Sequence, residues 1–202
     1  MRSNRSETGE ALSSRALLMT MLLVVAVLVA WLIPASYALA WTHHGCQFDD
    51  AQPPSITYKK RSMESAYSTA ASTAMSWWNS ETGSTTWFAW TSSNDPNIDI
   101  YDGIYSWSGW AKVTWSCWWA TDTYVGDEVQ MYYDTDAMDG LTSTEKAIVA
   151  THEFGHAYGL GHSSFGCSAP GPVVMKTGSS KFSCSGTPPW TNDVDGWEAL
   201  GY

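Results

Sequence analysis

The sequence predicts an α+β fold: a mixed, mostly parallel and twisted five-stranded sheet with three helices. Short segments rich in β-branched and aromatic residues alternate with longer segments of helical periodicity, in the order strand, helix, four strands, helix, loop, helix. A stretch rich in Gly, Ser and Pro, residues 163–190, separates the last two helices and is typical of a loop.

Five segments are expected to be strands because they are short, β-branched or aromatic, and bounded by turn residues such as Asn94-Asp95-Pro96 and Asp102-Gly103. The expected strands are Ser55–Lys60, Thr85–Ser93, Asn97–Tyr101, Lys112–Trp119 and Glu128–Asp134.

The first expected helix is Met63–Asn79. Its apolar residues follow a period of 3.6, which is typical of a helix with one buried face. The residues on that face are Tyr67, Ala70, Ala74 and either Trp77 or Trp78.

The second expected helix is Leu141–Gly159. Thr142 followed by Glu145 forms a capping box at its start, and Gly159 is a natural C-terminal stop. A short closing helix is expected in Thr191–Tyr202, with Thr191 or Asn192 as its cap.

Residues 1–40 resemble a secretory signal peptide. A segment with three arginines precedes the uncharged run Ala16–Ile33, Pro34 breaks that run, and Ala38-Leu39-Ala40 is a suitable cleavage site. The apolar run is also long enough to span a bilayer, so an uncleaved anchor remains the alternative. We expect residues 41–202 to form one domain that is secreted, or that faces outward from a membrane anchor.

The composition indicates which kinds of partner to exclude and which cellular compartment to expect. The net charge of −10 argues against nucleic acid and against an anionic membrane surface. Four cysteines in an exported chain suggest two disulfides. Three pairings are possible, and we favour Cys46–Cys117 with Cys167–Cys184 because the second pair is close in sequence.

Thirteen tryptophans are unusual for a chain of this length. Most are expected to pack in the core, where Trp buries a large area. Trp107 and Trp110, in a Gly/Ser loop, are the strongest candidates for contact with sugar rings.

Three of the five histidines lie in Thr151–Ser163, with the sequence THEFGHAYGLGHS. Four residues turn a helix by about 400°, so His152 and His156 project from the same face. Two imidazoles in this arrangement can bind one Zn²⁺, and Glu153 is placed to act as a base on a zinc-bound water. His162 can reach the same ion only if the chain turns sharply, and Gly159 is the residue that permits the turn.

The pattern H-E-x-x-H-x-x-G-x-x-H resembles the signature of the metzincin zinc endopeptidases, and Ser163 after the third histidine resembles the matrixin type. The resemblance implies a matrixin-like fold, Zn²⁺ held by His152, His156 and His162, catalysis by Glu153, and Met175 as the residue of a Met-turn. The C-terminal DVDGWEALGY and the helix ending at Trp77-Trp78-Asn79 resemble the matrixin domain too.

The chain also departs from the matrixin pattern. No propeptide with a cysteine switch is evident, and Cys46 is interpreted as half of a disulfide. A second zinc site rich in His and Asp is not evident. Calcium could be bound by oxygen ligands, although the spacing of the acids forms no loop signature. The candidate sets are Asp122, Asp127 and Glu128, or Asp95, Asp99 and Asp102.

These observations predict a secreted, monomeric zinc endopeptidase that hydrolyses peptide bonds with a zinc-bound water and Glu153. The resemblance implies that a protein or peptide substrate binds along the edge strand Lys112–Trp119, with the loop after His162 and Met175–Trp190 as one wall. The alternative is a non-catalytic extracellular module that binds a glycan or cell-wall polymer and contains a structural zinc. A membrane-anchored peptidase is a third possibility.

Overall fold

The computed structural model describes residues 42–49, 55–83, 87–118, 120–167 and 171–202. The chain divides into two compact units, Met1–Tyr37 and Ala38–Tyr202. The expected signal peptide lies outside the described residues. Within the described ranges, no helix combines the length and the apolar character needed to cross a membrane.

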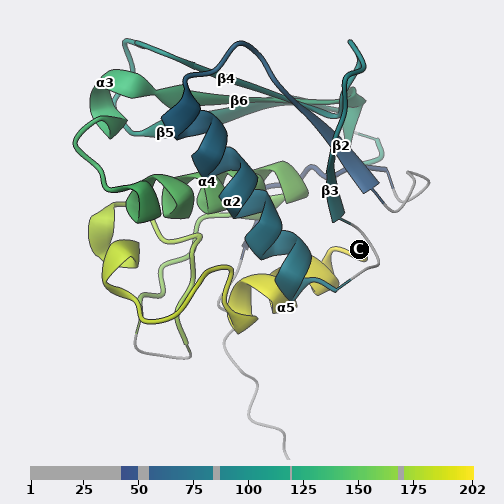
Figure 1. Cartoon of the computed structure of the whole chain (residues 1–202). Coiled ribbons are helices and arrows are strands. Elements are labelled where there is room, and N and C mark those ends of the chain that lie inside the picture. Colours follow the sequence, from purple (N-terminus) through teal and green to yellow (C-terminus); the bar gives the residue numbers. More distant parts are fainter. Residues whose placement is uncertain (1–41, 50–54, 84–86, 119, 168–170) are drawn as a thin grey trace, which may run out of the picture. The chain divides into compact units, whose positions relative to one another are not determined.

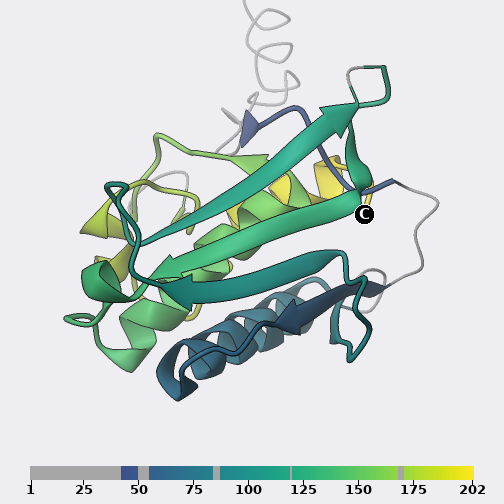
Figure 2. The ribbon, with the colours of Figure 1, turned by 90° about the horizontal axis from the view of Figure 1, so that it is seen from above.

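A five-stranded sheet forms the upper layer of the domain in Figure 1, and Figure 2 shows the sheet face on. Four strands are parallel and the fifth, β5, is antiparallel to its neighbour β6. The sheet therefore confirms the expected mixed, mostly parallel arrangement. The order across the sheet is β3 (Trp87–Trp90), β2 (Ser55–Lys60), β4 (Ile98–Gly103), β6 (Thr123–Asp134) and β5 (Ala111–Trp118).

The sequence pattern explains which sheet face is buried. Ile98 and Ile100 on β4 are fully buried, whereas the alternating residues Asp99 and Tyr101 are half-buried. The same alternation continues on β6, where Met131 and Tyr133 are buried and Tyr132 is half-buried. Because successive side chains of a strand point to opposite faces, one face of the sheet supplies the core.

The three expected helices are α2 (Ser65–Glu81), α4 (Ser143–Tyr158) and α5 (Thr191–Ala199). Two short helical elements were not expected: α3 (Thr135–Met138) follows β6, and the 3₁₀-helix η1 (Ser179–Ser183) lies within the Gly/Ser/Pro-rich loop.

One capping prediction is wrong. The N-cap of α5 is Trp190, not Thr191 or Asn192. The Asp193 carboxylate accepts a hydrogen bond from the Trp190 backbone N–H at 3.0 Å. The carboxylate of Asp193, in the first turn of the helix, therefore accepts the hydrogen bond of the N-cap backbone N–H. The helix start does not need a capping side chain from residue 191 or 192.

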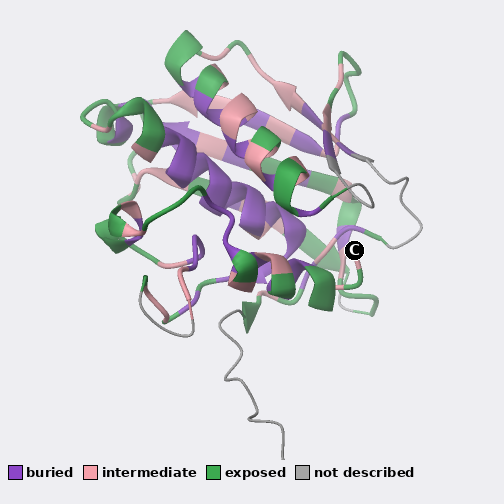
Figure 3. Cartoon of the chain, turned by 60° about the horizontal axis from the view of Figure 1, so that its bottom comes forward, coloured by how far each residue is buried: buried purple, intermediate pink, exposed green. Residues whose placement is uncertain are grey.

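Helices α2 and α4 pack together on the same face of the sheet (Figure 1). The Trp78 indole N–H donates to the Thr151 carbonyl of α4 at 2.9 Å, so Trp78, and not the half-buried Trp77, faces the core. Figure 3 shows buried residues along almost the whole of α4. This helix is the central element of the domain, and it also contains two of the three histidines.

Both expected disulfides are present, Cys46–Cys117 and Cys167–Cys184. The first joins the N-terminal segment of the described domain to β5. That segment also contains β1 (Thr42–His43), which pairs with the two-residue strand β7 (Leu160–Gly161) directly after α4. The N-terminal segment is therefore fixed beside the turn that follows the histidine helix.

Candidate metal centre

Local sequence signals position the first two histidines. The Thr142 hydroxyl accepts from the Glu145 N–H and the Glu145 carboxylate accepts from the Thr142 N–H, which is the expected capping box at the start of α4. The helix then runs without interruption through His152 and His156. Their rings lie 4.7 Å apart between centroids, one helical turn along the same face.

The turn after α4 brings the third histidine back to the other two. Gly159 has φ +113°, a conformation that side-chain-bearing residues rarely adopt. A Cβ at this position would also lie 2.7 Å from the Cys46 carbonyl oxygen. Only glycine therefore allows the chain to reverse here, pass through β7 and place His162 against His156.

The three imidazoles meet at one point. One ring nitrogen from each of His152, His156 and His162 lies within 4.8 Å of the other two. The Nε2 atoms of His156 and His162 are 3.1 Å apart. Two nitrogens bound to one tetrahedral Zn²⁺ at ~2.0–2.1 Å stand roughly 3.3 Å apart, so this spacing fits a shared zinc ion.

Backbone carbonyls fix the orientation of two of the rings. His152 Nδ1–H donates to the Val174 carbonyl at 2.7 Å, and His156 Nδ1–H donates to the Leu160 carbonyl at 2.7 Å. With Nδ1 protonated, the neutral ring has its lone pair on Nε2. This outer hydrogen bond is the usual means of orienting a metal-binding histidine. Burial also lowers the pKa of His156 to about 3, so the ring is neutral at pH 7.

Within the described part of the chain, the cluster contains three histidines and no fourth side chain of a metal-binding type. Among the described residues, the His cluster is the only group of three or more His, Cys, Asp or Glu side chains that is close enough to share an ion. The three rings line a cleft of about 500 Å³. Structural zinc sites have four protein ligands, whereas catalytic sites leave one position open. The donor set and the cleft fit a zinc ion with an open position.

Glu153 lies in the same cleft. Its side chain is buried, and burial raises its pKa to about 8. A carboxyl group beside three histidines, with a pKa near neutral, is able to exchange protons with a group bound in the cleft. A cation bound by the histidines would favour its charged form.

Met175 lies beneath the histidine helix and is completely buried. Its thioether packs against Gly155, which lies on α4 between His152 and His156. Asp193 holds the turn that contains Met175, since its carboxylate accepts from the Val174 N–H at 2.9 Å and from the Met175 N–H at 3.4 Å. Burial raises the pKa of Asp193 to about 6. The Met175 turn therefore supports the helix and, through the Val174 carbonyl, orients His152.

Ser163 directly follows the third histidine and is buried. Its N–H donates to the Met175 carbonyl at 2.9 Å, which pairs the chain after His162 with the Met175 turn. Ser163 and Met175, both singled out from the sequence, are thus brought together, and they connect the segment after His162 to the turn beneath the helix.

The expected edge strand forms one wall of the cleft. Ala111, Lys112, Val113 and Trp115 of β5 all line it. Within the described sheet, β5 pairs only with β6, so its other edge has no strand partner.

Two cleft residues were missed by the sequence reasoning. Lys181 of η1 and His44 of the N-terminal segment both line the cleft. The only signals were a single lysine in a Gly/Ser loop and a histidine two residues before Cys46, which do not indicate a site by themselves.

Lys181 is 4% exposed, although lysine is seldom buried. Its Nζ donates to the Lys176 carbonyl at 3.1 Å and lies 5.8 Å from the centre of the Trp110 ring. Burial lowers the pKa of Lys181 to about 8, and the charge of Glu153 acts in the opposite direction.

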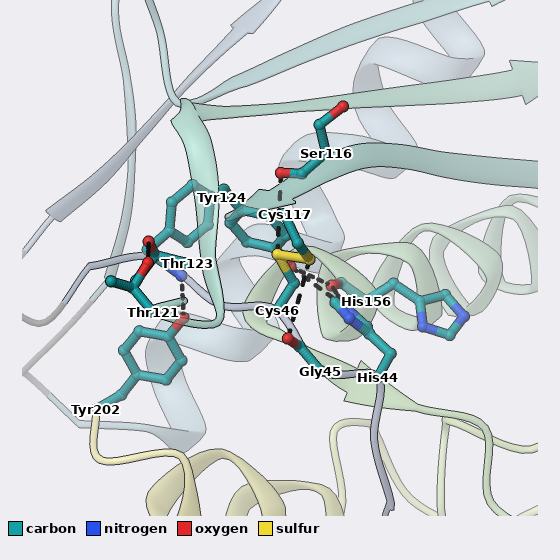
Figure 4. Close-up of a disulfide and its surroundings, with 11 residues drawn as sticks. His44, Gly45, Cys46, Ser116, Cys117, Thr121, Thr123, Tyr124, His156 and Tyr202 are labelled. Atoms are coloured by element: carbon teal, nitrogen blue, oxygen red, sulfur yellow. Dashed lines mark hydrogen bonds between the residues drawn. A yellow bond between two sulfur atoms is a disulfide. The ribbon is translucent and has the colours of Figure 1, made fainter. Parts of the chain in front are cut away.

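His44 supports the end of the histidine helix, as Figure 4 shows. Its Nε2–H donates to the His156 carbonyl at 2.7 Å, and the Tyr124 hydroxyl donates to the same carbonyl at 3.0 Å. The His44 ring stacks on Trp115 at 4.1 Å between centroids, and burial lowers the pKa of His44. The Cys46–Cys117 disulfide lies beside these contacts and fixes the segment to β5.

The acidic residues considered for calcium do not assemble. Neither set forms a group close enough to share an ion among the described residues. Asp99 instead pairs with the Arg61 guanidinium, with 2.8 Å between Oδ2 and Nη2, and the Asp102 carboxylate accepts from the Glu64 N–H at 2.7 Å. These acids stabilise the connections around β4.

The two tryptophans proposed to contact sugars have different environments. Trp110 lines the metal cleft and packs against Phe182 of η1. Trp107 stacks on Tyr105 at 4.2 Å between centroids and lies edge-on to Tyr132. Both rings are half-buried.

Comparison with known proteins does not identify a family for this chain. No family model matches the chain, and no curated protein matches it. A solved structure titled "GM1 bound form of the ECX AB5 holotoxin" matches with a TM-score of 0.48 and 15% identity, over 73% of this chain and 80% of that chain. A likeness this distant carries no argument about what the chain does.

These findings correct two predictions made from the sequence. The chain is not assigned to the metzincin family, and the class of matrixin-like zinc metalloendopeptidase drawn from that family is withdrawn. No family model and no curated protein matches the chain, so the comparisons give the assignment no support. The physical reason is that the signature governs about a dozen residues around one turn, whereas family membership requires similarity along the chain. Any activity must be argued from the site itself.

Proposed function

We propose that the three-histidine cluster binds Zn²⁺ and, together with Glu153, hydrolyses peptide bonds of an extracellular substrate. The observation that supports this most is the open cluster: three converging imidazoles, with no fourth His, Cys, Asp or Glu beside them among the described residues, face a cleft that also contains a buried carboxyl group. The two disulfides fit an oxidising compartment, and we propose that the protein is secreted.

His152, His156 and His162 would hold the zinc, which when bound polarises a carbonyl group and lowers the pKa of water. Glu153 accepts a proton from the attacking water at its carboxylate and then delivers that proton to the leaving amine. The Val174 and Leu160 carbonyls keep two imidazoles in the tautomer that presents Nε2 to the cleft. Val149 and Trp110 form an apolar part of the cleft wall.

The open edge of β5 is the proposed binding surface for the substrate backbone. Ala111–Val113 of this strand border the cleft beside the histidines. An extended peptide that pairs with this edge would add a strand to the sheet and bring its backbone carbonyls past the cluster.

The test compares the exported wild-type protein with Glu153→Gln. We expect both proteins to bind one zinc ion, and the variant to cleave a mixed peptide library at least 10²–10⁴-fold more slowly. Glu198→Gln, an exposed acid on α5, is the matched control and should retain the wild-type rate. Equal rates for wild type and Glu153→Gln would contradict the role of Glu153, and a zinc-loaded wild type that cleaves no peptide would contradict the proposed function.

A second candidate is a non-catalytic module that binds a glycan. Aromatic rings gather around β4 and β6, where Tyr101 stacks on Tyr132 at 5.2 Å and Tyr105 stacks on Trp107 at 4.2 Å between centroids. Aromatic faces of this kind suit sugar rings, because one side is apolar and the hydroxyl groups lie at the edge. Binding of glycan or cell-wall polymer that is lost in Trp107→Ala, with no peptide cleaved, would favour this candidate.

A further inference from the structure

The buried lysine in the metal cleft has no part in the chemistry described above. Lys181 lies on η1 and lines the same space as Glu153 and the three histidines. Two contacts hold its position. Its Nζ donates to the Lys176 carbonyl, and its neighbour Phe182 packs against Trp110 at 5.0 Å between ring centroids.

The hydrogen-bonding capacity of Lys181 is not filled within the described part of the protein. An ammonium group has three donors, and one hydrogen bond, to the Lys176 carbonyl, is recorded for it. Lys181 and Glu153 do not form a direct ion pair, because Arg61–Asp99 is the salt bridge found among the described residues. The charge of Glu153 still acts on Lys181 through the cleft. Burying an ammonium without a carboxylate partner is unfavourable, which suggests that its partner is a ligand.

The charges around Lys181 favour an anion. Among the described residues that line the cleft, Glu153 is the only acid, whereas Lys112 and Lys181 are both cationic. The chain as a whole has a net charge of −10. The cleft therefore differs in the sign of its charge from the chain as a whole. Its positive charge favours a negatively charged group of a ligand over a neutral group of the same shape.

We propose that Lys181 binds a carboxylate of the substrate, so that the cleft selects peptides with an acidic residue next to the bond that is cut. This inference rests on the proposed function. The ammonium donates its free N–H groups to the carboxylate, while the apolar surfaces of Trp110 and Val149 contact the methylene groups of the same side chain. Glutamate or aspartate is therefore preferred over glutamine or asparagine.

The experiment uses pairs of fluorogenic peptides that differ only by Glu or Gln, placed in turn at each position flanking the cleaved bond. We expect kcat/KM of the wild type to be about 10- to 100-fold higher for the Glu peptide at one position, the range of a charge-assisted hydrogen bond. In Lys181→Met, the Glu-to-Gln ratio should fall to near one. Lys60→Met, which removes a lysine that does not line this cleft, should leave the preference unchanged.

Two outcomes would overturn the inference. If the wild type shows no preference for Glu over Gln at any position, the cleft does not select a carboxylate. If Lys181→Met lowers kcat/KM equally for both peptides, Lys181 acts on Glu153 or on the reacting group instead of on the substrate side chain. Zinc content and thermal unfolding of each variant show whether it has folded.

A binding measurement separates this inference from the proposed activity. Zinc-loaded Glu153→Gln is titrated with the Glu and Gln peptides and compared with the double variant Glu153→Gln/Lys181→Met. Tighter binding of the Glu peptide only when Lys181 is present supports the inference even if the wild type cleaves nothing. Equal binding of both peptides by Glu153→Gln contradicts it, and this result also decides the matter if Lys181→Met does not fold.

Discussion

Gly155 and Met175 lie in direct contact beneath the histidine cluster. Gly155 is the α4 residue just before His156, and a Cβ at this position would overlap the Met175 thioether and approach its terminal methyl carbon to 3.2 Å. The Trp78 ring closes the same space at 3.4 Å. The spacing of α4 above the Met175 turn therefore depends on the absence of a side chain at position 155.

This contact predicts that Gly155→Ala is destabilising, although alanine is favoured over glycine in a helix interior by about 1 kcal/mol. We expect a net loss of about 2 kcal/mol in the free energy of unfolding, because the added methyl group overpacks the core. Chemical denaturation measures this loss. Gly140→Ala, where a Cβ would meet nothing within 4 Å, is the control and should change stability by less than about 0.5 kcal/mol.

The same contact can be tested by a double-mutant cycle. Met175→Ala makes room for the new methyl group, so Gly155→Ala should cost less in that background than in the wild type. Additive effects of the two substitutions would mean that the two side chains do not determine each other's packing.

Zinc should stabilise the protein through the histidine cluster. At a free concentration of 100 times its Kd, zinc is expected to raise the free energy of unfolding by about 2.7 kcal/mol relative to chelator-treated protein. Thermal unfolding with and without the metal measures this shift. His162→Ala should abolish most of it, whereas His43→Ala, an exposed histidine outside the cluster, should not. A shift of the same size in all three proteins would place the metal elsewhere.

Burial of Glu153 predicts a pH dependence in zinc-free protein. Its pKa is raised from 4.5 to about 8. A carboxyl group with a raised pKa in the folded state contributes stability that is fully present below the unfolded pKa, and this stability is lost as pH rises through the folded pKa. Between pH 4.5 and 8 the wild type should therefore lose about 4 kcal/mol relative to Glu153→Gln, which lacks the titrating group.

Denaturation of both proteins in chelator across this pH range measures the difference. The comparison with Glu153→Gln cancels the titration of the histidines, which are present in both. Parallel stability curves for the two proteins would show that Glu153 is ionised in the folded state at acidic pH.

The Cys46–Cys117 disulfide should contribute more to stability than Cys167–Cys184. The two bonds close loops with sequence separations of 71 and 17 residues. In the chain-entropy model these loops correspond to about 4 and about 3 kcal/mol. Paired Cys→Ser variants, compared by chemical denaturation, test the order, and a larger loss from Cys167→Ser/Cys184→Ser would contradict it. Loss of the first bond should also lower zinc affinity, because it releases the segment that contains His44.

Local physics in the sequence determined most of the secondary structure and the framework of the site. The boundaries of β2 agree with the expected strand, and the capping box of α4 forms as expected, because both depend on residues close together in the chain. The convergence of His152, His156 and His162 is local in the same sense. It requires a helical turn and one glycine with positive φ, and both can be recognised within thirteen residues.

Only the tertiary structure decided what surrounds that framework. Lys181 and His44 reach the cleft from segments separated by more than a hundred residues, and no local pattern predicts such an encounter. The same holds for Asp193, which caps α5 and supports the Met175 turn at once. The sequence by itself determined three convergent histidines and a neighbouring acid, because helix geometry is short-range. The charge of the cleft, its walls and the contacts that hold the Met175 turn depend on packing between residues far apart in the sequence. They could therefore be identified only from the folded chain.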